Sequence, residues 1–318
     1  MTTQQLPTVS RRRFVATACG STLAMSLAPC RLFADDISPV IKIRKAAATA
    51  EIAVTKLRGN VSVLEGSGGN IAVLTGRDGK LLVDAGITAT RKGITEALSG
   101  LSADPIKHLI DSHWHFDHTD GNEWLHSEGA EITAHENTLK HLSVDTRVEG
   151  WRFTFPASPA GALPTKLFAD ELKLQVNGTT LALKYYLPAH TDSDISVHFT
   201  DADILHVADT FWNGVYPFID YSTGGSIDGS IRAAEANVAR VTDKTIVIPG
   251  HGPVGNKTQL IAFRDMLVAI REKVAALKKQ GRSLEEAQAA KPTAAFDEKW
   301  GGWVIGGRTF TSLVYAGV

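Results

Sequence analysis

The sequence predicts an α+β protein in which two β-sheets pack together and helices cover both outer faces. Three observations predict this class: two β-rich blocks, helical segments after each block, and a sequence without internal repeats or low-complexity linkers. The chain of 318 residues is 43% hydrophobic and 21% charged, which is typical of a globular protein with a substantial core. We therefore expect one folded unit over residues 35–318, with no further domain boundary.

Residues 1–34 predict an export signal. Three consecutive arginines precede an apolar segment, and small residues lead to a cleavage position near Ala34. The tripeptide Ser10-Arg11-Arg12, followed by Phe14, resembles the twin-arginine signal that the twin-arginine export machinery reads as an address. A basic tail followed by a membrane helix is the alternative, but the apolar run is short for a bilayer. We expect a periplasmic or secreted protein without a stable membrane anchor.

The first β-rich block begins at residue 61. Its segment 61–86 alternates β-rich runs with glycine-containing turns, which predicts antiparallel hairpins. Helical spacing then covers 87–101, and a short apolar run at 107–110 predicts a buried strand. Residues 131–142 predict a strand followed by a helix.

The second β-rich block spans residues 165–209. Asn177-Gly178 is its clearest hairpin turn. Three elements then complete the pattern: a helix at 226–241, a strand at 244–250 and a long amphipathic helix at about 257–280. Ser283 and Glu286 predict a capping box for one more helix.

Composition restricts the partners and the chemistry. The formal net charge is −1 and no long basic run follows the signal, so no nucleic-acid partner is expected. The only two cysteines, Cys19 and Cys30, lie within the predicted signal. Cleavage would therefore leave no thiol for a disulfide, a nucleophile or a metal ligand. Any bound metal must use nitrogen and oxygen ligands, and composition predicts no oligomeric state.

A dense group of imidazole and carboxylate side chains follows the strand at 107–110. Within six positions the chain holds His113, His115, Asp117 and His118. These side chains are usual ligands of zinc and similar metals. His113 and His115 lie two apart in an extended segment, so they can point to the same side. Asp117 and His118 fall on the following turn and suit a second metal better.

Further ligands stand after other predicted strands. His190, Asp209 and His251 each follow an apolar run, so all three can converge with the first group on one sheet edge. Together they give seven ligands, as expected for two metals that share a carboxylate and a water. Asp192 and Asp194 are interpreted as capping or bracing their loop. The remaining histidines are interpreted as surface or core packing: His108, His126, His135, His141, His198 and His206.

These residues resemble the metallo-β-lactamase fold superfamily over roughly residues 60–255. Its H-x-H-x-D-H motif is met at 113–118, and its later His, Asp and His follow in order. The resemblance implies a four-layer αβ/βα sandwich with two zinc ions per chain, although other divalent metals suit the same ligands. It implies three ligand roles: one ion on His113, His115 and His190, the other on Asp117, His118 and His251, and Asp209 as the bridge. It also implies that Asp84 orients a ligand.

The chemistry that the resemblance implies is hydrolysis of an ester, lactone, thioester or lactam bond of a small molecule by a metal-bound hydroxide. Asp117 would be catalytic, because it orients the hydroxide besides binding zinc. Asp209 resembles the bridging aspartate of glyoxalase-II-like hydrolases, lactonases and phosphodiesterases. Lactamases with a cysteine at this position carry a lysine three residues later, where this chain has Trp212. A β-lactamase proper, a periplasmic accessory metalloprotein of a quinoprotein system and a metal-binding protein without turnover remain alternatives.

Four aromatic residues follow Asp209 closely: Trp212, Tyr216, Phe218 and Tyr221. They come directly after a ligand position and are interrupted by Asn213-Gly214 and Pro217. We therefore interpret them as the wall of a substrate pocket rather than as core. Trp114, between two ligands, is expected to pack beneath the site. The segment 296–318, rich in Trp and Gly, is expected to close over it.

Overall fold

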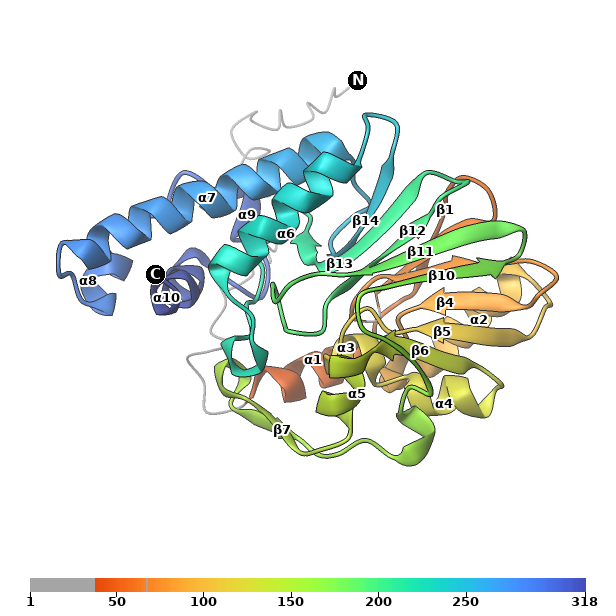
Figure 1. Ribbon diagram of the computed structural model, residues 1–318. Helices are drawn as coiled ribbons and strands as arrows, with labels where there is room; N and C mark the ends of the chain where they lie inside the picture. Colours follow the sequence, from red (N-terminus) through yellow and green to blue (C-terminus); the bar gives the residue numbers. More distant parts are fainter. Residues whose placement is uncertain (1–37, 67) are drawn as a thin grey trace, which may run out of the picture.

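Two β-sheets lie face to face in the computed structural model, which describes residues 38–66 and 68–318 (Figure 1). Helices lie against the outer face of each sheet, so the predicted four-layer arrangement is confirmed. The predicted export signal lies outside the described residues. Within the described part of the chain, no helix combines the length and the apolar character needed to cross a bilayer.

The first sheet contains seven strands. In spatial order they are β1 (Ala53–Lys56), β2 (Val61–Glu65), β3 (Ile71–Leu74), β4 (Lys80–Val83), β5 (Ile106–Ile110), β6 (Glu131–His135) and β9 (Lys166–Phe168). Strands β1 to β4 pair antiparallel, as the predicted hairpins require, and β4, β5, β6 and β9 pair parallel. The sequence analysis placed β9 in the second block. It instead extends the first sheet, because the chain returns beside β6 before it crosses over.

The second sheet contains five strands. They are β10 (Glu171–Val176), β11 (Thr179–Tyr185), β12 (Ile195–Phe199), β13 (Ile204–Trp212) and β14 (Ile246–His251). All pairs are antiparallel except β13 and β14, which are parallel. Asn177 and Gly178 connect β10 to β11 with positive φ angles of 54° and 75°, as the predicted hairpin turn requires.

Alternating side chains build two kinds of core. Val63 of β2 and Leu181 of β11 belong to the same apolar cluster between the sheets. Leu64, the next residue of β2, lies on the opposite face and packs with Ile94 and Leu125. This period of two is the pleat of a β-strand, and it shows that the sheets are buried on both faces.

Helices complete the outer layers. The outer face of the first sheet carries α2 (Arg91–Leu101) and α4 (Asn122–Ser127), and the outer face of the second carries α6 (Ile227–Arg240) and α7 (Lys257–Lys279). The remaining helices are α1 (Pro39–Ala47), α3 (Phe116–Thr119), α5 (Glu136–Leu142), α8 (Leu284–Ala289), α9 (Asp297–Trp300) and α10 (Gly307–Ala316). A small hairpin of β7 (Thr146–Val148) and β8 (Phe153–Phe155) lies apart from both sheets. The predicted capping box of Ser283 and Glu286 begins α8.

Candidate metal centre

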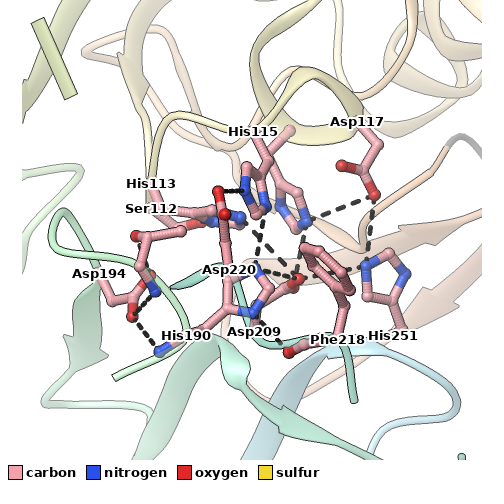
Figure 2. A network of polar contacts seen from close by, with 12 residues as sticks. Ser112, His113, His115, Asp117, His190, Asp194, Asp209, Phe218, Asp220 and His251 are labelled. Carbon is pink, nitrogen blue, oxygen red and sulfur yellow. Dashed lines mark hydrogen bonds and ion pairs between the residues drawn. The ribbon is translucent and has the colours of Figure 1, made fainter. Parts of the chain in front are cut away.

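All seven predicted ligands meet where strand ends of both sheets come together (Figure 2). The first sheet contributes the segment after β5 and the short helix α3. The second contributes the β11–β12 loop, β13 and the end of β14. Their donor atoms form two groups, each within 4.8 Å: His113, His115, His190 and Asp209 in one, and Asp117, His118 and His251 in the other.

Asp209 lies between the two groups. Its Oδ2 atom is 3.2 Å from His190 Nε2 in the first group and 3.5 Å from His251 Nε2 in the second. Its Oδ1 atom is 3.1 Å from His118 Nε2, also in the second group. Figure 2 shows the side chains of His190 and His251 beside this carboxylate. The position suits a carboxylate shared by two ions.

A backbone irregularity aims Asp209 at the centre. The sequence analysis placed Asp209 after a strand, but it lies within β13, directly after Ala208, whose φ is +44°. The β13–β14 register shifts on both sides of Ala208, so the strand carries a β-bulge, a feature that redirects side chains. Gly250 of β14 makes room for the carboxylate: an added Cβ would lie 1.9 Å from Asp209 Oδ1.

Orphaned donor atoms test whether a metal fits. Within the described residues, four buried atoms of this site have no hydrogen-bond partner: Nε2 of His113, His118 and His251, and Oδ1 of Asp209. Asp209 Oδ1 and His118 Nε2 are close, but their geometry is not that of a hydrogen bond. Buried polar atoms are rarely left without a partner. Nitrogen and oxygen donors that converge in this way fit divalent metal ions of the zinc class.

The second nitrogen of three of the ligand imidazoles is held elsewhere. His118 Nδ1 lies 2.8 Å from Asp84 Oδ2, and His190 Nδ1 lies 2.9 Å from the carbonyl oxygen of Phe218. His115 Nε2 lies 3.1 Å from Asp220 Oδ2. Such bonds fix the tautomer and the ring orientation of a metal ligand. His115 therefore presents Nδ1 to the centre, whereas His118 and His190 present Nε2.

Asp84 orients more than one group, as the resemblance implied. Besides His118, its carboxylate accepts hydrogen bonds from the backbone N–H of Ser112 at 2.7 Å and from Ser112 Oγ at 2.8 Å. Asp84 is fully buried at the end of β4, with a left-handed φ of +70°. The carboxylate thus connects the end of β4 to the ligand segment after β5.

Asp220 was missed by the sequence analysis. Its carboxylate binds His115 Nε2 and also accepts hydrogen bonds from Thr223 Oγ1 and the backbone N–H of Ser222. It caps the short 3₁₀ helix η4 (Tyr221–Thr223). The sequence shows only an aspartate at the end of an aromatic segment, which is no more than a capping signal.

The electrostatics of the site favour a bound cation. Burial would lower the pKa of His118, but Asp209, Asp84 and Asp117 together raise it well above its usual range. Burial would likewise raise the pKa of Asp209, but His251 and His118, among other neighbours, hold it well below its usual range. Asp209 is therefore ionised near neutral pH, as a metal-bridging carboxylate requires.

The structure places two of the four aromatic residues of the predicted wall at the site. Trp212 and Phe218 line a small cavity above Asp117, Asp209 and His251. Tyr216 does not: it is fully buried, stacks on Phe310 of α10, and donates a hydrogen bond to Asp297. Tyr221 donates to the carbonyl of Leu313, also on α10, and does not line the cavity. Both tyrosines therefore lie outside this cavity, because α10 packs against their segment.

Two distant segments close the cavity over the metal ligands. Pro39 and Ile43 of α1 line it from one side, and residues 303–305 line it from the other. The Trp303 ring lies 5.2 Å from the ring of His251 and 5.6 Å from that of Trp212. Within the C-terminal segment that was expected to cover the site, residues 303–305 line the cavity. The contribution of α1 was not predicted.

The neighbouring polar residues behave as the sequence analysis expected. Asp194 braces its loop by accepting hydrogen bonds from the backbone N–H groups of His190 and Thr191. Asp192 lies 2.7 Å from His141 Nε2 at the edge of the same loop. Trp114 is 2% exposed and packs against the His115 ring at 4.9 Å.

Comparisons with known proteins agree with this geometry. The profile of the Metallo-beta-lactamase superfamily matches residues 64–254. The solved structure of the stereoselective inverting sec-alkylsulfatase Pisa1 from Pseudomonas sp. is similar at a TM-score of 0.63 and 18% identity, covering 86% of this chain and 51% of that chain. This chain thus spans about half the length of the alkylsulfatase.

Two solved metallo-beta-lactamases are also similar. The enzyme from Pontibacter korlensis matches at a TM-score of 0.56 and 19% identity, covering 69% of this chain and 99% of that chain. DIM-1 metallo-beta-lactamase matches at 0.55 and 20%, covering 69% and 97%. Identities this low show a shared fold. Among curated proteins, no significant match is found.

Proposed function

The chain belongs to the metallo-beta-lactamase superfamily, and from this premise we propose that it is a dizinc hydrolase of an ester, lactone, thioester or lactam bond in a small molecule. The observation that carries the proposal is the position of Asp209, which lies close to histidines of both groups, together with four buried donor atoms of the site that have no hydrogen-bond partner. A purely structural cluster has no need to leave such atoms without partners.

Each residue has a distinct task in this proposal. His113, His115 and His190 hold one ion, and Asp117, His118 and His251 hold the other, with Asp209 shared. Two divalent ions in such a site lower the pKa of water and stabilise developing negative charge. Asp117 lines the cavity, and its Oδ2 lies 3.4 Å from His251 Nε2. It is therefore placed to orient the attacking water by accepting a hydrogen bond, which makes it the proposed catalytic residue.

The cavity lining bears on the alternatives. Trp212 lines the cavity, and it stands three residues after Asp209, the sequence position at which β-lactamases of the cysteine-containing type carry a lysine. Secondary alkyl sulfate hydrolysis is a second candidate, because the similarity to the sec-alkylsulfatase covers more of this chain than the similarity to either β-lactamase. An accessory metalloprotein of a quinoprotein system would not need an open cavity above the ligands.

We propose, separately, that the protein is exported by the twin-arginine route and acts in the periplasm or outside the cell. The support is the arginine pair ahead of an apolar segment in the first 34 residues. This route carries folded proteins, so metal can be loaded before export.

Metal analysis and a substrate panel test the enzyme proposal. The purified protein should hold close to two zinc ions per chain after dialysis, and His251→Ala should hold close to one. His126→Ala removes an exposed histidine outside the site and serves as the matched control. A stoichiometry near one that His251→Ala leaves unchanged would overturn the dinuclear assignment.

The substrate panel should contain chromogenic esters, lactones, thioesters, β-lactams and a secondary alkyl sulfate. Zinc-loaded protein should cleave at least one of the carbonyl substrates, and His251→Ala should lose that activity. Cleavage of the alkyl sulfate alone would replace the primary proposal by the second candidate. A panel without any turnover, on protein that holds two zinc ions, would favour the accessory role.

A further inference from the structure

A groove continues from the metal centre along α1. Its volume is about 580 Å³, which is within the range of small-molecule sites. Ile43, His251 and Trp303 line both this groove and the smaller cavity over Asp209. A molecule whose reacting bond lies at the metal ligands can therefore extend into the groove.

The walls of the groove are apolar. On one side α1 and the residues after it present Ile43, Ala46, Ala47 and Ala50, and Trp303 and Val304 form part of the other side. Among the described residues that line the groove, Glu65 is the one charged residue apart from the proposed ligand His251. An extended apolar chain would bury its surface here, which is the main source of affinity in such pockets.

Cationic side chains do not line this site in the described parts of the chain. The lining residues of the groove and of the smaller cavity include neither lysine nor arginine. Arg44 of α1 is not among these lining residues, and its guanidinium lies 2.9 Å from Asp120 and over the ring of Phe116 at 5.3 Å. A carboxylate or sulfate in the groove would lose its hydration without gaining a counter-charge.

The α1 wall is fixed to the rest of the protein at both ends. Ser38 Oγ, at the N-cap of α1, donates a hydrogen bond to the carbonyl of Trp151 at 2.8 Å. Arg44, in the last turn of α1, donates a hydrogen bond to Asp120 and holds the other end of the helix. The groove is therefore a built feature with a defined shape, and not a gap under a loose segment.

We propose that the site acts on a neutral substrate whose apolar chain lies in the groove between α1 and residues 303–304. This inference rests on the proposed hydrolase function and narrows its substrate class. Ile43 and Trp303 are the specificity-determining residues, because they line the groove and the cavity over the ligands alike. Substrates that place an anionic group in the groove, away from the reacting bond, fit this lining poorly.

A chain-length series of esters tests the proposal by kinetics. On zinc-loaded full-length protein, kcat/KM should rise from 4-nitrophenyl acetate to butyrate, hexanoate and octanoate, by up to roughly fourfold for each methylene that becomes fully buried. The 4-nitrophenyl monoester of octanedioate matches the octanoate in length but ends in a carboxylate. It should react at least tenfold more slowly than the octanoate.

Two variants and one control identify the groove as the cause. Ile43→Glu places a carboxylate in the wall and Trp303→Ala removes the opposite wall, so both should lower the ratio of octanoate to acetate kcat/KM toward one. Ile43→Leu, which keeps an apolar side chain in the wall, should retain the chain-length dependence of the wild type. Ile41→Glu makes the same change on the same helix, but Ile41 is 54% exposed and outside the groove, so its profile should match the wild type.

A binding measurement keeps the two proposals separable. Calorimetric titration with 1-butanol, 1-hexanol and 1-octanol needs no turnover, and affinity should rise with length in the wild type and in Ile41→Glu but not in Ile43→Glu. Cleavage with flat length dependence in both measurements would overturn the groove proposal and leave the hydrolase standing. Length-dependent alcohol binding without ester cleavage would support the groove and count against ester hydrolysis. If the alcohols do not bind and the esters are not cleaved, the groove proposal and the ester assignment are both overturned.

Discussion

Replacement of Asp84 by asparagine is the sharpest test of how the ligand shell is held. The backbone at this position is left-handed, with φ of +70°, and asparagine tolerates this conformation better than most residues. Asp84→Asn therefore keeps the size and the backbone and changes only the charge and one acceptor. The carboxylate now receives three hydrogen bonds: from the N–H of Ser112, from Ser112 Oγ and from His118 Nδ1.

The expected magnitude follows from those contacts. The amide offers one oxygen and one NH₂ group, so at least one of the three donors faces another donor. A hydrogen bond to a charged group contributes about 1.5–3 kcal/mol. Loss of an outer partner of a metal ligand typically lowers metal affinity by about 10- to 100-fold, which corresponds to about 1.4–2.8 kcal/mol. The two scales agree, so we expect the ion on His118 to bind about 10- to 100-fold more weakly.

Chelator competition measures this change. Zinc content is followed while a chelator of known affinity is titrated into wild type and variant, and one of the two zinc equivalents, the ion on His118, should be lost at a lower chelator concentration in the variant. Asp203→Asn is the matched control, because Asp203 also has a left-handed φ, of +50°, and accepts a hydrogen bond from Thr245 at 2.7 Å, outside the ligand groups. Unchanged zinc affinity in Asp84→Asn would show that the carboxylate braces the backbone without tuning the metal.

Three further outcomes are expected. Gly250→Ala should lose one zinc ion and at least tenfold in activity, because the new Cβ would lie 1.9 Å from Asp209 Oδ1, whereas Gly100→Ala, with no atom within 4 Å, should change neither. Asp209→Ala should lose most hydrolysis and, by metal analysis, some metal, because the ions lose the negative charge between them. Asp209→Cys should retain metal with altered activity, since its single sulfur binds at about 2.3 Å. A fully active and fully metallated Asp209→Ala would refute the bridging role of Asp209. Replacing Arg11 and Arg12 together by lysine should leave precursor in the cytoplasm on fractionation, and normal delivery would remove the twin-arginine assignment.

The metal ligands were predictable because their signals are local. His113 and His115 follow an apolar strand within a few residues, and His190 and His251 each follow an apolar run. In a two-sheet sandwich the strand ends that carry these residues meet at one edge. The order of the residues along the chain was therefore enough to predict that they converge. The fold class followed for the same reason, since periods of two and of 3.6 are properties of short segments.

Other features depend on contacts that no local pattern reports. Ala208 adopts a positive φ, and alanine gives no hint of this, so Asp209 was expected after its strand and not within it. Tyr216 and Tyr221 belong to the core because α10, nearly a hundred residues later, packs on them. Asp220 acquires its role only when His115 arrives from the other sheet.

The division of the ligands between the two sheets sets an order of events during synthesis. The four donors of segment 113–118 leave the ribosome first, and the last donor, His251, follows well over a hundred residues later. A nascent chain therefore exposes four of the seven candidate ligands before the last of them is synthesised. Contacts this distant in sequence form slowly, so the complete centre is assembled only after both halves have folded and docked. In the proposed dizinc enzyme, the choice of ion is therefore made after translation, when β14 pairs with β13.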